Sequence, residues 1–143
     1  MRDQRFIAAH RGGPLKMEEH QLLINWACRC VEHVVPIFGE PIDERLIHSI
    51  WVAKQWESGN ATVGEARSAS LEAIAVAREA TNPGRVALAR AIGHAVATAH
   101  MADHALVAAS YALKALKASG KSTEEERKWQ NEQVPPEIRH LLI

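Results

Sequence analysis

The chain has 143 residues, a length that suits one domain with a hydrophobic core of its own. It carries 17 Lys and Arg against 17 Asp and Glu, so its formal net charge is zero and nucleic acid is not expected as its main partner. No signal-peptide core and no apolar run near the roughly 18 residues of a membrane span is found, so we expect a cytoplasmic protein.

The first predicted helix follows an N-terminal arm, residues 1–14. Pro36 lies in its last turn and should weaken its end, because proline has no amide hydrogen to donate. Gly39 and Pro41 then separate it from a second helix, which ends near residues 58–60. Apolar side chains recur at helical spacing in the first helix: Leu23, Trp26, Ala27, Cys30, Val31, Val34 and Phe38. The second carries Leu46, Ile47, Ile50, Trp51 and Ala53.

The two cysteines of the chain, Cys28 and Cys30, are two residues apart in the first predicted helix. Side chains at that spacing point about 200° apart around a helix. We therefore expect two free thiols rather than a disulfide or a metal-binding pair.

The third predicted helix begins with a capping box, in which Thr62 is the N-cap and Glu65 the third helical residue. It runs to about Ala80. The cap and the helix dipole account for Glu65. Arg67 has no such local role, so we expect it to form a salt bridge to another helix.

A fourth helical stretch begins at Asn82 and Pro83, which suit the N-cap and the first helical position. Its pattern continues to about Ala118, which is long for one helix of a globular protein. We therefore expect an interruption within residues 98–103. After Ser119-Gly120-Lys121, a charged helix to Gln133 and a short turn at Pro135-Pro136 complete the chain.

The distribution of alanine and tryptophan indicates how these helices pack. Residues 61–118 hold 20 of the 24 alanines, and all four tryptophans lie outside that segment. Small side chains let helix axes approach closely, and large ones fill wider gaps. We predict one all-α domain, residues 1–143, built as a compact bundle of about five or six mostly antiparallel helices. The alanine-rich helices should be central, and the tryptophan-bearing helices should cover them. Residues 119–143 should form a charged helix and tail whose segment 124–128 faces solvent.

Three histidines lie close together in the sequence: His94, His100 and His104, with Asp103 beside the last of them. His100 and His104 are one helical turn apart and would share a face, as two ligands of a metal do. His94 would point elsewhere on an unbroken helix, so the three converge only where the helix breaks. We interpret the group as a structural polar network. A partner-binding face and a metal or catalytic centre are the alternatives.

A second unusual stretch, His10-Arg11-Gly12-Gly13-Pro14-Leu15, lies in the arm. Arg11 would present its planar donors to a carboxylate from an exposed glycine-rich loop. The alternative is that the two glycines only turn the chain into a helix that starts near Pro14.

We expect the arm and the histidine-rich stretch to meet. Buried polar groups without partners cost about 1–3 kcal/mol each, so both stretches need partners. His94, His100 and Asp103 should therefore form a hydrogen-bonded network with His10 and Arg11, coupling Arg11 to His100 in stability. Imidazoles committed in this way leave no lone pairs for a metal, and we expect no cofactor.

Several of these segments together resemble a bacterial family of small helical immunity proteins linked to toxin systems. They are residues 10–15, Val63-Gly64-Glu65-Ala66-Arg67, residues 93–105 (Gly93-His94-Ala95-Val96-Ala97-Thr98-Ala99-His100-Met101-Ala102-Asp103-His104-Ala105) and Tyr111-Ala112-Leu113-Lys114-Ala115. The resemblance covers residues 10–118, and residues 129–142 more loosely. It implies a non-enzymatic protein that neutralises a toxin by binding it. It transfers no catalytic or contact residues.

The sequence thus predicts a protein-binding module whose partner is a cognate toxin. One alternative is a small enzyme that uses a metal or the histidines near residue 100. Another is a helical scaffold or homodimer without a toxin. The candidate binding or network residues are His10, Arg11, Glu65, Arg67, His94, His100, Asp103 and His104.

Overall fold

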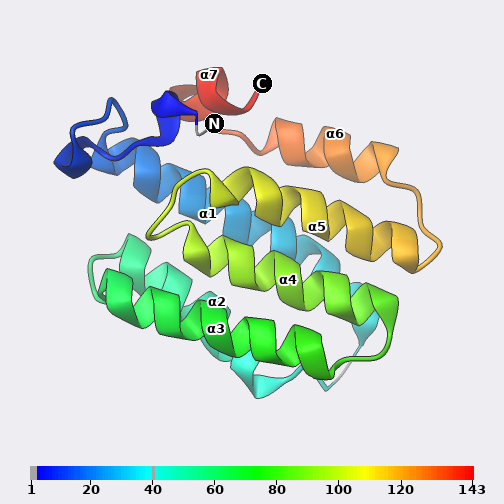
Figure 1. Ribbon diagram of the computed structural model, residues 1–143. Coiled ribbons are helices and arrows are strands. Elements are labelled where there is room, and N and C mark those ends of the chain that lie inside the picture. The colour runs from blue at the N-terminus through cyan, green and yellow to red at the C-terminus, as the bar shows by residue number, and fades with distance from the viewer. Residues whose placement is uncertain (1–2, 40) are drawn as a thin grey trace.

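The computed structural model describes residues 3–39 and 41–143 (Figure 1). This part of the chain contains no strand, and the all-helical prediction is confirmed. The helix beyond the five or six expected is α7, a four-residue turn of the tail. The α-helices are α1 (Met17–Val34), α2 (Glu44–Glu57), α3 (Val63–Glu79), α4 (Pro83–Ala97), α5 (His104–Ala118), α6 (Glu124–Glu132) and α7 (Arg139–Leu142). Short 3-10 turns are η1 (Gln4–Phe6), η2 (Ala9–Arg11), η3 (Val35–Phe38) and η4 (Pro136–Ile138).

The helices form two layers. Helices α3, α4 and α5 lie side by side and alternate in direction, while α1 and α2 pack behind them (Figure 1). Helix α4 occupies the middle, in contact with α1, α2, α3 and α5. It is buried on nearly every side, and Arg85 and Arg90 are its exposed charged side chains.

Close helix approach around α4 depends on small side chains. Its buried residues include five alanines and two glycines among the larger Leu88, Ile92 and Val96. A Cβ atom built on Gly93 would lie 3.4 Å from the Cβ of Ala73 in α3. A Cβ on Gly84 would lie 2.7 Å from the ring of Phe38. The alanine-rich segment is therefore the tightly packed centre that its composition predicted.

The predicted helix ends agree with the structure. Thr62 and Glu65 form the capping box, with both bonds present at 2.9 and 3.0 Å. The Asn82 side chain caps α4 and Pro83 is its first residue. The expected interruption is also confirmed, since α4 ends at Ala97 and α5 begins at His104.

Helix α1 belongs to the core rather than to its cover. Leu23, Ile24 and Val31 are fully buried, and Trp26 exposes only 3% of its surface. The expectation that tryptophan-bearing helices only cover the alanine-rich segment is therefore wrong for α1. Cys28 and Cys30 are buried free thiols, as predicted.

Helix α6 is held against α1 by polar and aromatic contacts. The indole Nε1 of Trp26 donates to the carbonyl of Gln130 at 2.9 Å. His33 stacks on Trp129 with ring centroids 3.6 Å apart, and its Nδ1 lies 2.6 Å from a carboxylate oxygen of Glu126. The 124–128 segment is thus solvent-facing except at Glu126, which was expected to be solvated with the rest.

Overpacking α4 tests this arrangement. Ala91 has no exposed surface, so Ala91→Leu forces added methylenes into a filled core. We expect it to lower the free energy of unfolding by about 1–3 kcal/mol, measured by urea denaturation. The same substitution at exposed Ala118 is the control and should change stability by less than about 0.5 kcal/mol. Equal effects at the two positions would contradict the tight packing.

Candidate functional site

Four histidines gather where the α4–α5 loop, residues 98–103, meets α1 and the N-terminal arm. We call His20, His94, His100 and His104 the histidine cluster. The break after Ala97 turns the chain through this loop, so His94 at the end of α4 faces His104 at the start of α5. On an unbroken helix these two side chains would point apart.

His94 and His104 form a direct pair. Their Nδ1 atoms are 2.8 Å apart, so one must donate a hydrogen bond to the other. The His94 ring also stacks on Tyr111 of α5, with ring centroids 5.3 Å apart and an angle of 8° between the planes. Burial lowers the pKa of His94, and the charges of His104, Arg90 and Lys114 lower it further. If both Nδ1 atoms carried a proton, neither could accept the hydrogen bond and the pair would break. The pair therefore favours neutral rings, in agreement with the lowered pKa of His94.

His20 is the buried member of the cluster, with 3% of its surface exposed. Its Nε2 lies 2.5 Å from the carbonyl oxygen of Thr98 and must donate, because a carbonyl only accepts. Its ring packs against Trp56 with centroids 4.8 Å apart. Burial lowers the pKa of His20, in opposition to the Thr98 hydrogen bond. A neutral His20 therefore ties α1 to the end of α4.

His20 was not predicted as a site residue, although the sequence carries a signal for it. His20 precedes Leu23 and Ile24 by three and four residues, so it extends the apolar stripe of α1 toward the N-terminus. A histidine on such a stripe is placed in the core and needs a polar partner there. The partner, a loop carbonyl 78 residues away in sequence, could not be found by periodicity.

His100 lies next to the N-terminal arm, on the side where Arg11 was predicted as a partner. Its Nδ1 is buried and has no hydrogen-bond partner among the described residues, so this nitrogen takes no part in the predicted network with His94 and Asp103. The loop turns His100 toward the arm, where it lines a cavity of about 220 Å³ together with His20 and Arg11. Burial lowers the pKa of His100, and the nearby charge of Arg67 adds to this effect. Coupling between Arg11 and His100 stays a prediction.

The N-terminal arm reaches the cluster through a tight loop. Gly12 has φ 84°, and the amide of Leu15 donates to the carbonyl of Ile7 at 3.0 Å. A Cβ on Gly13 would lie 2.1 Å from that carbonyl oxygen, so glycine is required there. The arm thus folds back as expected, but α1 begins at Met17 rather than near Pro14.

The other predicted residues divide between the cluster and local roles. His10 lines a second small cavity beside His20, and Asp103 is the N-cap residue of α5. Glu65 serves the α3 cap, whose hydrogen bonds with Thr62 lower its pKa. Arg67 is exposed and forms no ion pair with a described carboxylate, contrary to the expected salt bridge.

The hydrogen-bonded ring nitrogens of the cluster are directed at one another and at the backbone rather than at a common point. No group of three or more His, Cys, Asp or Glu side chains in residues 3–39 and 41–143 is placed to hold a metal ion. His94 and His104 direct their Nδ1 atoms at each other, and His20 uses its Nε2 hydrogen for a backbone carbonyl. The arrangement joins three helices and leaves the His94 and Tyr111 rings half-exposed at the surface.

An apolar groove on α2 is a separate surface feature. Ile47 and Trp51 are 55% and 56% exposed, and they line a groove of about 360 Å³ with Val35 and Pro36. The sequence analysis assigned both side chains to the apolar pattern of this helix without separating its two faces. At the rim, Lys54 and Glu32 form an ion pair of 2.9 Å.

Comparison with known proteins places the chain in a family. A family model described as "Imm-5 like putative immunity protein" matches residues 13–137. The chain belongs to this immunity-protein family. The match covers the histidine cluster, all of α1–α6 and the Trp51 groove, and it confirms the resemblance seen in the sequence.

No curated protein and no solved structure gave a significant match. In the part of the chain that the structure describes, no helix is both long and apolar enough to cross a membrane.

The stability of this immunity-family protein should depend on pH. The pKa values of His20, His94 and His100 are lowered from 6.5 in the folded state, so the unfolded chain binds more protons as the pH falls below about 6.5. Stability is then lost on acidification, by up to about 1.4 kcal/mol per pH unit for each proton difference. Urea denaturation between pH 8 and pH 5 measures the slope.

The variant His94→Gln should flatten this slope, while His48→Gln, at a half-exposed ring on α2, should change it less. A wild-type stability that is constant or rises on acidification would contradict the assignment.

The direct pair can be tested by a double-mutant cycle. His94→Ala and His104→Ala should show a coupling energy of about 0.5–1.5 kcal/mol at pH 7.5, because each change removes the same hydrogen bond. His94→Ala with His140→Ala, on the distant α7, should be additive within about 0.5 kcal/mol. Additivity in the first cycle would show that the pair does not contribute to stability.

Proposed function

We propose that the protein neutralises a protein toxin by binding it, without catalysis, in the cytoplasm of a bacterial cell. The observation that carries the proposal is the family match over residues 13–137. A non-catalytic mode is supported by two contacts of the histidine cluster: the Nδ1 atoms of His94 and His104 bond to each other, and the Nε2 of His20 bonds to a backbone carbonyl.

The shape of the molecule also suits a binding role. The structure has two wide surfaces built on rigid helices, the outer side of the α3–α4–α5 layer and the Trp51 groove of α2. Exposed Trp51 is the type of side chain that contributes strongly to protein interfaces. Preformed helical surfaces bind without the entropic cost of ordering a loop.

A stoichiometry experiment distinguishes binding from catalysis. A toxin domain encoded beside the gene is produced with and without this protein, and growth and complex formation are followed. We expect rescue of growth, a complex of defined ratio in size-exclusion chromatography with light scattering, and toxin inhibition that is complete only when the proteins reach that ratio. An enzyme would inactivate an excess of toxin with time.

The fold control is Ala118→Leu, which should neutralise as well as the wild type. Loss of toxin activity at a small fraction of the stoichiometric amount would contradict the proposal, and so would the absence of both complex and rescue.

A further inference from the structure

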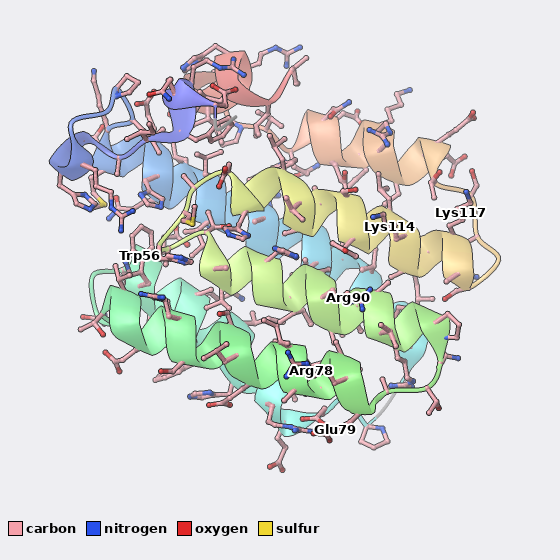
Figure 2. All side chains as sticks on the ribbon, in the orientation of Figure 1. Trp56, Arg78, Glu79, Arg90, Lys114 and Lys117 are labelled. Carbon is pink, nitrogen blue, oxygen red and sulfur yellow. The ribbon has the colours of Figure 1, made fainter. Side chains whose placement is uncertain are left out.

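Each of the three helices of the α3–α4–α5 layer places at least one cation on its outer surface. Arg67 and Arg78 lie eleven residues apart on α3, about 20° from one another around the helix. Arg90 is exposed on α4 and Lys114 on α5. Figure 2 shows Arg78, Arg90 and Lys114 on the three helices of this layer. We call Arg67, Arg78, Arg90 and Lys114, with the side chains between them, the basic face.

Acidic side chains of the same helices point elsewhere. Glu79 of α3 forms an ion pair of 2.8 Å with Arg45 of α2. Glu72 of α3 lies 3.6 Å from the Nδ1 of His48, which is also on α2. Both carboxylates therefore face α2. No described carboxylate forms an ion pair with Arg78, Arg90 or Lys114. Residues 63–118 contain six Arg and Lys but four Asp and Glu, in a chain where the totals are equal.

Apolar and aromatic groups fill the space between these cations. Leu71 and Ile74 lie between Arg67 and Arg78 on the same stripe of α3 and are 66% and 38% exposed. Tyr111 stacks on His94, and the ammonium of Lys114 lies 4.3 Å from the Tyr111 ring centroid. Apolar groups surrounded by charges of one sign are typical of a surface that attracts and then packs against a charged partner.

We infer that the basic face is a docking surface for an acidic protein surface, which under the proposed function is a surface of the toxin. Cations on three adjacent helices attract carboxylates and speed association, while Leu71 and Tyr111 provide area to bury. The groove at Trp51 does not favour an acidic partner in this way, because the opposite charges of Lys54 and Glu32 at its rim form an ion pair.

A basic face can contact only certain surfaces of a toxin. Enzymes that act on nucleic acids bind phosphates through basic clefts. The basic face would repel such a cleft. The covered surface is therefore acidic, and is not the nucleic-acid-binding cleft of a toxin.

The test uses the full-length protein and poly-L-glutamate of about 50 residues as the acidic probe. Binding is measured by fluorescence anisotropy of the labelled probe at about 50 mM salt, where surface charges are only partly screened. The variant combines Arg78→Glu, Arg90→Glu and Lys114→Glu. We expect its Kd for the probe to rise at least about tenfold and its circular dichroism spectrum to stay unchanged, because all three side chains are exposed.

A control variant combines Lys16→Glu, Lys128→Glu and Arg139→Glu, three exposed cations outside the layer that give the same change in net charge. Its Kd should change by less than about threefold. A neutral set, Arg78→Gln, Arg90→Gln and Lys114→Gln, replaces the charge-reversed variant if that one does not fold. It should weaken binding in the same direction.

Three results would overturn the inference: no measurable binding of the probe, equal effects of the two charge-reversed variants, or tighter binding of a DNA duplex of about 20 base pairs through the same three cations. The last result would identify a nucleic-acid surface. Because none of these measurements uses a toxin, the basic face and the proposed function can fail independently. If the protein bound a toxin and the charge reversal did not weaken that binding, the proposed function would stand. The basic face would then not be the toxin-binding surface.

Discussion

The packing of α4 depends on side chains small enough to let four other helices reach it. Alanines and Gly93 bring α3 within van der Waals contact, so the helix has almost no surface left for solvent. Where α3 and α4 approach most closely, this arrangement leaves little space for large side chains. Leu23, Ile24 and Trp26 of α1 supply large side chains from the layer behind.

At the end of α4, buried backbone carbonyls need hydrogen-bond donors from other parts of the chain. Where the helix stops at Ala97, its last carbonyls lose their partners and the chain must turn within a few residues. The imidazole of buried His20 satisfies the carbonyl of Thr98, and the Thr98 hydroxyl donates back to the carbonyl of His94 at 3.0 Å. The histidines thus complete a helix end between packed elements. This structural role accounts for their position next to one another at the end of α4.

The same packing separates the two outer surfaces of the molecule. With α3 and α4 so close, acidic side chains of α3 turn toward α2, and the cations remain on the opposite side. A chain with zero net charge therefore has a basic face, which total composition conceals. The family membership gives such a surface a biological setting under the proposed function, in which the protein acts by binding a toxin.

The sequence by itself determined the helices. Caps at Thr62 and Asn82, proline at Pro83, the glycine-rich arm and the break within residues 98–103 are local signals that act through backbone hydrogen bonds a few residues apart. The same local spacing predicted free Cys28 and Cys30. These features do not depend on how the helices pack.

Tertiary structure alone decided the partners of polar side chains. The sequence predicted a network of His94, His100 and Asp103 that reaches the arm. In the structure His100 does lie beside the arm, but its Nδ1 has no partner among the described residues, and His94 pairs with His104, because the loop geometry sets their directions. His20 and its carbonyl partner are 78 residues apart in the sequence. The carboxylate of Glu79 on α3 pairs with Arg45 on α2. Hydrogen bonds and ion pairs act over a few ångströms in space, so a pattern along the chain identifies the residues that need partners and only the packed helices determine which partners they find.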